Sequence, residues 1–224
     1  MPIFAAVGLI FPGTVTLLTF AANRLLGPVL TGTLGNLAPL FAVALAVTVL
    51  GEPLRALQLA GLIVTVAGIA LLTLGRGEAA RRELSWYLLL PLAAALLRGV
   101  TQATIKLGLE LWPSALAAAL IGYLVSTIVV LTAAKLGTGR FVARAPARGL
   151  LWFASVGWCN GIAALLMYAA LASGPVTLVS PLVATYPLVT VGLSLLVLHK
   201  IEVSARLVLA VAVTVAGVVL LIAG

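Results

Sequence analysis

Three polar side chains are spaced four residues apart within one long apolar segment. Arg98, Gln102 and Lys106 lie between residues 86 and 107, and Thr101 lies beside them. An α-helix has 3.6 residues per turn, so this spacing places the three on one face. A guanidinium on such a face would bind a carboxylate or phosphate of a solute. The alternatives for Arg98 are that the span is shifted along the membrane normal or that the guanidinium bonds to a backbone carbonyl. Lys106 is close enough to the segment's end to snorkel.

Two prolines interrupt apolar segments at matching positions. Pro39 and Pro187 each remove a backbone N–H and free a carbonyl about one turn earlier. Asn36 lies near the first proline, and Thr185 and Tyr186 precede the second. We expect these positions to kink the helices and to line or gate a cavity. The alternative is a packing kink that touches no ligand.

Two further polar residues have a structural alternative to a functional role. Asn160 follows Trp158 and Cys159 in an apolar segment, and its amide can bind a solute or join two helices. Glu52 lies between two segments. We expect its carboxylate to cap the helix that follows it, because a negative charge is favoured near a helix N-terminus.

Groups that catalyse reactions or bind metals are scarce. The chain has one histidine and one cysteine, and its five acidic residues are all glutamates at segment ends or between segments. No metal-ligand spacing or phosphate-binding loop is present. We therefore expect no enzyme activity, no cofactor and no metal site. A proton-coupled exporter of cationic drugs is also not indicated, since it needs a carboxylate within the bilayer.

The composition defines the class of protein. Hydrophobic residues make up 63% of the 224 residues and charged residues 8%, whereas soluble domains have about 45–50% and about 25%. The net charge is +8, but the cations lie between apolar segments and form no patch, which indicates membrane topology and not nucleic-acid binding. We predict a multi-pass protein of the cell membrane, surrounded by the lipid bilayer.

Eight segments approach or exceed the roughly 20 apolar residues that a spanning helix needs. Their length and their Ala and Leu content favour helices over strands, so we predict an all-α transmembrane bundle. The predicted spans are Ile3–Ala22, Leu26–Leu50, Ala56–Leu74, Trp86–Leu107, Ala115–Ala134, Leu150–Ala172, Val176–Leu198 and Leu207–Ala223.

The sequence contains an internal repeat. Val64-Thr65-Val66-Ala67-Gly68 recurs as Val213-Thr214-Val215-Ala216-Gly217, and Gly27-Pro28-Val29 aligns with Gly174-Pro175-Val176. We predict a first repeat of three spans over residues 1–75, a loop over 76–85, and a second repeat of five spans over 86–224. Because five is an odd number, a full copy of five helices ends on the opposite side of the membrane from its start. The next copy would therefore have the inverted orientation. This is the inverted-repeat arrangement of many secondary transporters, whose solute site lies at the midplane.

The chain resembles the EamA-type members of the drug/metabolite transporter superfamily. The resemblance is carried by Gly27-Pro28-Val29, Pro39, the stretch Leu50-Gly51-Glu52-Pro53-Leu54 and, in the second copy, Gly174-Pro175-Val176 and Pro187. Members typically have ten helices in two inverted repeats of five. The resemblance therefore implies that the first copy lacks two helices, either because the chain starts late or because it is a shortened form. The second copy departs by having His199-Lys200 where the first has Gly51-Glu52.

The orientation of the chain remains open. Most cations lie in the first, third, fifth and seventh loops, so the positive-inside rule places these loops in the cytoplasm and both termini outside. The resemblance implies the reverse.

These features predict a permease of small metabolites that works by alternating access, and the resemblance implies export. The Arg98 face indicates an anionic or zwitterionic solute such as an amino acid. The predicted binding residues are Arg98, Gln102, Asn36, Asn160, Thr185 and Tyr186, with Pro39 and Pro187 as kinks. The alternative is a non-transporting or truncated membrane subunit that needs a partner chain or a second copy.

Overall fold

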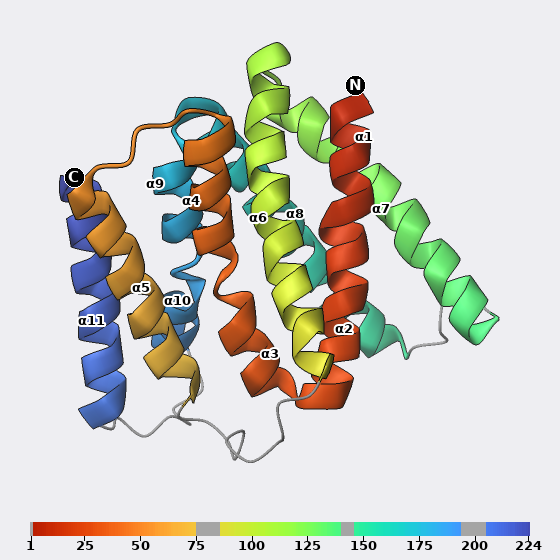
Figure 1. Ribbon diagram of the computed structural model, residues 1–224. Coiled ribbons are helices and arrows are strands. Elements are labelled where there is room, and N and C mark those ends of the chain that lie inside the picture. Colours follow the sequence, from red (N-terminus) through yellow and green to blue (C-terminus); the bar gives the residue numbers. More distant parts are fainter. Residues whose placement is uncertain (1, 75–85, 140–145, 194–204) are drawn as a thin grey trace. The chain divides into compact units, whose positions relative to one another are not determined.

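The computed structural model describes residues 2–74, 86–139, 146–193 and 205–224, and this part of the chain is helical without a β-strand (Figure 1). The predicted all-α fold is confirmed. The helices are α1 (Pro2–Gly8), the π-helix η1 (Leu9–Thr14), α2 (Val15–Leu26), α3 (Pro28–Gly35), α4 (Ala38–Val49), α5 (Ala56–Leu74), the 3₁₀ turn η3 (Trp86–Leu88), α6 (Leu89–Leu111), α7 (Ala115–Thr138), α8 (Ala147–Ser173), α9 (Val176–Val183), α10 (Tyr186–Leu193) and α11 (Ala205–Ala223).

In the described residues all eight predicted spans are helical, although their ends shift by several residues. The end of the seventh predicted span (194–198) and the predicted loop over 76–85 lie outside the described residues. In the described ranges, seven segments are long and apolar enough to cross a membrane: Pro2–Leu26, Leu30–Val49, Trp86–Leu111, Ala115–Gly137, Ala147–Ser173, Val176–Leu193 and Ala205–Ala223. The eighth, in α5, is a shorter apolar helix over Ala56–Leu71. The chain is therefore a multi-pass membrane protein.

The first span differs from the single helix predicted over Ile3–Ala22. It continues to Leu26 and is interrupted at Pro12, where the Phe11–Pro12 peptide bond is cis. Phe11 has φ −134° and ψ 132°, outside the helical region. Proline lacks the N–H of a regular helix, which explains why the interruption falls here.

The chain divides into two compact units. One comprises Met1–Leu17 and Thr104–Gly174, and the other Leu18–Ala103 and Pro175–Gly224. Each unit contains residues of both predicted repeats, whose boundaries stay a prediction.

The first unit is built on α7. This helix packs against α1, η1 and α8. A Cβ atom on Gly8 would lie 2.9 Å from the Cα atom of Gly122, so α1 and α7 touch backbone to backbone at these two glycines. Small residues allow this close approach of helices in a membrane.

The second unit pairs α5 with α11, which lie side by side and run in opposite directions (Figure 1). The two copies of the Val-Thr-Val-Ala-Gly motif face each other here. A Cβ atom on Gly68 would lie 2.6 Å from the Thr214 backbone nitrogen, and one on Gly217 would lie 2.8 Å from the Thr65 Cα atom. The contact is reciprocal between the repeats, as expected for two copies of opposite direction.

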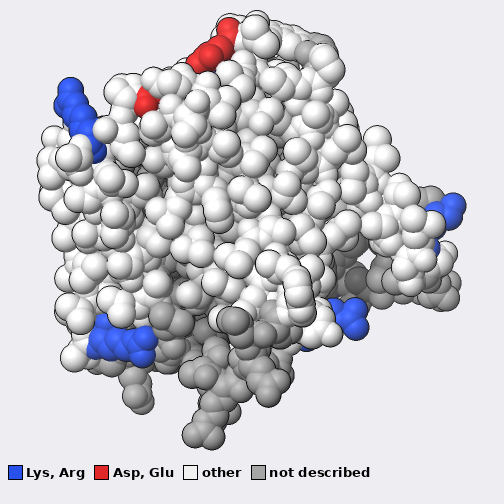
Figure 2. Space-filling view, viewed as in Figure 1, with Lys and Arg blue, Asp and Glu red and all other residues white. Residues whose placement is uncertain are grey.

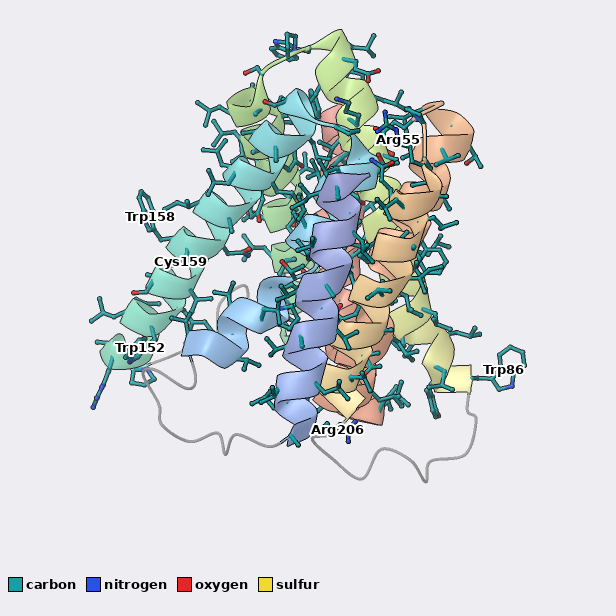
Figure 3. The ribbon with its side chains drawn as sticks, turned by 90° about the vertical axis from the view of Figure 1, so that its left-hand side faces the viewer. Arg55, Trp86, Trp152, Trp158, Cys159 and Arg206 are labelled. Atoms are coloured by element: carbon teal, nitrogen blue, oxygen red, sulfur yellow. The ribbon has the colours of Figure 1, made fainter. Side chains whose placement is uncertain are left out.

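Charged side chains mark the helix ends. In Figure 2 the charged groups on the visible face lie at the ends of the helices, with an uncharged surface between them. Figure 3 shows Arg55 and Arg206 at opposite ends of the α5–α11 pair. Trp86, Trp152 and Trp158 project outward and are exposed (Figure 3). A wide uncharged surface of this kind suits contact with lipid tails.

Candidate solute-binding site

Two predicted spans of the second unit are broken into half-helices in the same way. The first is divided into α3 and α4, and the second into α9 and α10. Pro39 is the second residue of α4, and Pro187 is the second residue of α10. The kinks predicted at both prolines are thus present in the backbone.

The hydrogen bonds at the two breaks match, 148 residues apart. The N–H of Leu37 donates to the carbonyl of Leu34 at 3.1 Å, and the N–H of Thr185 donates to the carbonyl of Leu182 at 3.1 Å. The next bond also recurs, since Leu40 donates to Leu37 at 3.0 Å and Leu188 donates to Thr185 at 2.9 Å. The same local chemistry produces both breaks, because each proline lacks the N–H that would continue the helix.

A cavity of about 180 Å³ lies beside the first break. Helix α3 contributes residues on one face, at spacings of three and four, and α6 does the same. The lining residues are Thr19 and Asn23 of α2, Pro28, Thr31, Gly32 and Gly35 of α3, Pro91, Ala94, Ala95 and Arg98 of α6, and Tyr186 of α10. Among these described residues, Arg98 is the one that carries a charge.

The position of Arg98 in its helix is unusual for a cation. It is at the middle of the 26-residue segment Trp86–Leu111. A cation at the centre of a bilayer costs about 2.5–3.5 kcal/mol on insertion scales, so such residues usually face a cavity or a partner. Gly99 fixes this part of α6 against α4, because a Cβ atom there would lie 2.7 Å from the Ala42 nitrogen and 3.0 Å from the Ala38 oxygen.

Polar groups at the break complete the cavity. The hydroxyl of Tyr186 donates to Oδ1 of Asn36 at 3.5 Å, which links α10 to the end of α3. Gly35 lines the cavity, and its carbonyl has no i+4 donor because residue 39 is proline. The C-terminal end of a helix carries partial negative charge. The cavity therefore has a cation on α6 and lies beside the C-terminal end of α3.

Of the six predicted binding residues, Arg98 and Tyr186 line the cavity, and Asn36 is hydrogen-bonded to Tyr186 without lining it. Gln102 is one turn beyond Arg98 and is 6% exposed, but it does not line the cavity, and its Oε1 accepts no hydrogen bond from the described residues. Thr185 donates to the carbonyl of Leu182 at 2.7 Å. Asn160 is exposed on α8, in the other unit.

The sequence interpretation missed the polar residues of α2 and α3. Thr19 and Asn23 line the cavity and are four residues apart, which places them on one helical face. That spacing was the available signal. Thr31 was harder to find, because its hydroxyl also donates to the carbonyl of Gly27 at 2.9 Å and such local bonds are common for threonine in helices.

Two charged residues have partners that differ from the expected ones. Glu52 does not cap α5, the helix that follows it. Its Oε1 and Oε2 accept hydrogen bonds from the N–H groups of Val176 and Thr177, each at 2.8 Å, at the start of α9. Lys106 was expected to snorkel toward the membrane surface, but its side chain has specific partners. Its Nζ donates to the carbonyls of Leu171 and Gly174, each at 3.1 Å, at the end of α8.

A larger groove of about 420 Å³ lies between α7 and α8 in the first unit. Its lining includes Leu116, Leu120, Ile162 and Leu165, and Tyr123 and Trp158 supply its polar side-chain atoms. It offers no charged group to a polar solute. Among the described residues, no group of His, Cys, Asp or Glu side chains is placed to hold a metal ion. The Arg98 cavity is therefore the better candidate for recognition.

Comparisons with known proteins agree with this architecture. Residues 84–223 match the EamA-like transporter family. One solved crystal structure of a protein shares the fold with a TM-score of 0.74 and 21% sequence identity, over 98% of this chain and 76% of that chain. At this identity the likeness concerns the fold alone. A comparison with curated proteins gave no match.

Proposed function

Because this chain belongs to the EamA-like transporter family and is a membrane permease of small molecules, we propose that it carries a solute with an anionic group, bound at Arg98. The observation that carries this proposal is the guanidinium at mid-span, lining a cavity whose described lining residues include no carboxylate. A solute carboxylate or phosphate would be attracted to this mid-span cation. Arginine is well suited to this, since it binds such groups with two parallel hydrogen bonds.

The cavity volume limits the solute. An engineered protein cavity of about 150 Å³ binds benzene, which has six non-hydrogen atoms. The cavity of about 180 Å³ therefore suits a solute of about six to eight such atoms. Small carboxylates and amino acids fall in this range.

An amino-acid-like solute has two charged groups, and the cavity offers a place for each. Its carboxylate would lie at Arg98. Its ammonium group would lie at the end of α3, where Gly35 has a carbonyl without an i+4 donor. Half-helix ends of this kind hold the charged groups of substrates and ions in other transporters.

The transport cycle follows from the two matching breaks. We propose that the two broken spans bend at these breaks, so that the site opens alternately to the two sides of the membrane. The family resemblance favours export and a place in the plasma membrane.

Uptake into liposomes tests the proposal. The purified chain is reconstituted and supplied with radiolabelled L-alanine, pyruvate or choline. We expect uptake of at least one of the two carboxylates and none of choline. Arg98→Ala should reduce carboxylate uptake to the level of empty liposomes, whereas Arg55→Ala, which removes a cation bound to the carbonyl of Gly224, should not. Equal carboxylate uptake by wild type and Arg98→Ala would contradict the proposal, as would transport of choline alone.

A membrane subunit that works with a partner or a second copy is the second candidate. Asn160 favours it, because this amide is exposed in the middle of the apolar helix α8 and an unsatisfied amide is costly in hydrocarbon. Cys159 is adjacent and exposed, and it is the one cysteine of the chain. Thiol cross-linking in native membranes would give a dimer if a second copy lies on α8, and a monomer band alone would count against a second copy there.

A further inference from the structure

Glu52 joins two parts of the second unit that are far apart in the sequence. Its own backbone is fixed to α4, because its N–H donates to the carbonyl of Ala46 at 3.1 Å and Gly51 turns the chain with φ 69°. Its carboxylate holds the start of α9, which is 124 residues away. Both carboxylate oxygens are used, each at 2.8 Å.

The groups that Glu52 binds have little access to water. Val176 and Thr177 are 0% and 3% exposed. The first N–H groups of a helix have no partner within the helix, and α9 has no side-chain cap from its own N-cap residue, Pro175. A carboxylate at this position satisfies two of these donors and favours the positive end of the helix dipole. Removing it would leave two buried donors unsatisfied.

Helix α9 leads directly to the cavity. It has eight residues and ends at Val183, and α10 begins three residues later with Tyr186. Tyr186 lines the cavity and donates to Asn36. A rise of 1.5 Å per residue makes α9 about 12 Å long. Because the helix is short and leads directly to Tyr186, a displacement of its first turn would also displace the part of the cavity wall that Tyr186 forms.

The matching half-helix of the first repeat begins with a different residue. The N-cap of α3 is Gly27, which has φ 84°. The sequence position that corresponds to Glu52 in the second repeat is Lys200, which lies outside the described residues. A lysine has only donors and cannot accept from N–H groups.

We propose that Glu52 is a positioning residue for the solute site: its carboxylate fixes α9 and thereby places Tyr186 in the wall of the cavity that Arg98 also lines. The first part of this inference concerns the fold alone, and the second part rests on the proposed function of the Arg98 cavity.

Thiol labelling tests whether Glu52 fixes α9. The background carries Cys159→Ala, and a single cysteine is introduced as Ala184→Cys, at a position 9% exposed at the end of α9. We expect Glu52→Ala and Glu52→Gln to raise the rate at which the cysteine at position 184 reacts with N-ethylmaleimide at least about tenfold. The reason is that losing a helix cap worth about 1.4 kcal/mol raises the population of the open form by a factor of ten. Glu52→Asp should restore part of the protection. Glu110→Gln is the matched control.

A second cysteine position separates a local release from general unfolding. Ala22→Cys is fully buried on α2, in the same unit. A higher labelling rate at position 184 with an unchanged labelling rate at position 22 supports the inference. No increase at either position overturns it, and equal increases at both show a general structural role and also overturn it.

Uptake kinetics test the link to the solute. For the carboxylate that wild type carries, Glu52→Gln should raise KM severalfold more than it lowers the maximal rate. An unchanged KM, together with Arg98-dependent uptake, overturns the positioning role. If uptake does not depend on Arg98, the proposed function fails, and the labelling experiment still decides whether Glu52 fixes α9.

Discussion

The closest helix contact of the second unit gives a sharp stability prediction. The perturbation is Gly68→Ala on α5. The added Cβ atom would lie 2.6 Å from the nitrogen and 2.8 Å from the Cα atom of Thr214, and it would also meet the threonine hydroxyl. Non-bonded heavy atoms normally lie about 3.5–4.0 Å apart, so α11 would have to move away by about 1 Å.

The expected loss follows from the atoms that the new methyl group meets. The nitrogen and the Cα atom of Thr214 belong to the backbone, so a change of rotamer cannot relieve these two contacts. Overpacking of this kind costs about 1–3 kcal/mol, and part of it is offset by the better helix propensity of alanine, which is about 1 kcal/mol over glycine. Gly217→Ala should behave similarly, because its Cβ atom would lie 2.8 Å from the Cα atom of Thr65.

Thermal unfolding of the purified protein in detergent measures the effect. A loss of 1 kcal/mol lowers Tm by about 2–4 °C for a chain of this size, so Gly68→Ala should lower Tm by several degrees. The matched control is Gly192→Ala on α10, where a Cβ atom would meet no atom of the described residues within 4 Å, and Tm should stay level or rise. If Gly68→Ala and Gly192→Ala raise Tm equally, α5 and α11 do not pack as closely as described.

Four other variants test the helix breaks, the buried amide of Gln102 and the contacts of Lys106. Pro39→Ala and Pro187→Ala restore an N–H at each break and remove a helix-breaking residue that costs about 3 kcal/mol, so we expect equal or higher Tm and slower uptake; unchanged uptake would argue against a role of the breaks. Gln102→Leu removes a buried amide whose Oε1 lacks a donor among the described residues, so Tm should stay level or rise, and a loss of uptake would instead place Gln102 at the solute. Lys106→Met removes two hydrogen bonds at the end of α8 and should lower stability by about 1–3 kcal/mol while KM stays unchanged; an unchanged Tm would show that these bonds contribute little.

The features that the sequence predicted well depend on local chemistry. Long apolar segments identify the spans, because a membrane requires continuous helices. Pro39 and Pro187 identify the breaks, because the missing N–H acts at the proline itself. Arg98 could be recognised because a cation in the middle of an apolar span is costly unless it has a use.

The features that were missed depend on tertiary contacts. Glu52 was predicted to cap the next helix, but its carboxylate binds the start of α9 after the turn at Gly51. No local sequence pattern encodes a partner that is 124 residues away. Gln102 shares a helical face with Arg98, but four residues at 1.5 Å each place it about 6 Å further along the helix axis. Arg98 is the last residue of α6 that lines the cavity, and Gln102 lies beyond it.

Equilibrium binding to purified protein tests the central claim most directly. The ligand is the radiolabelled carboxylate that wild type carries, and the proteins are wild type, Arg98→Gln and Arg55→Gln. We expect Arg98→Gln to raise Kd at least about tenfold, since a hydrogen bond to a charged group contributes about 1.5–3 kcal/mol and 1.4 kcal/mol is a factor of ten, while Arg55→Gln binds like wild type. Equal affinity of wild type and Arg98→Gln would contradict the assignment of Arg98 as the residue that binds the solute.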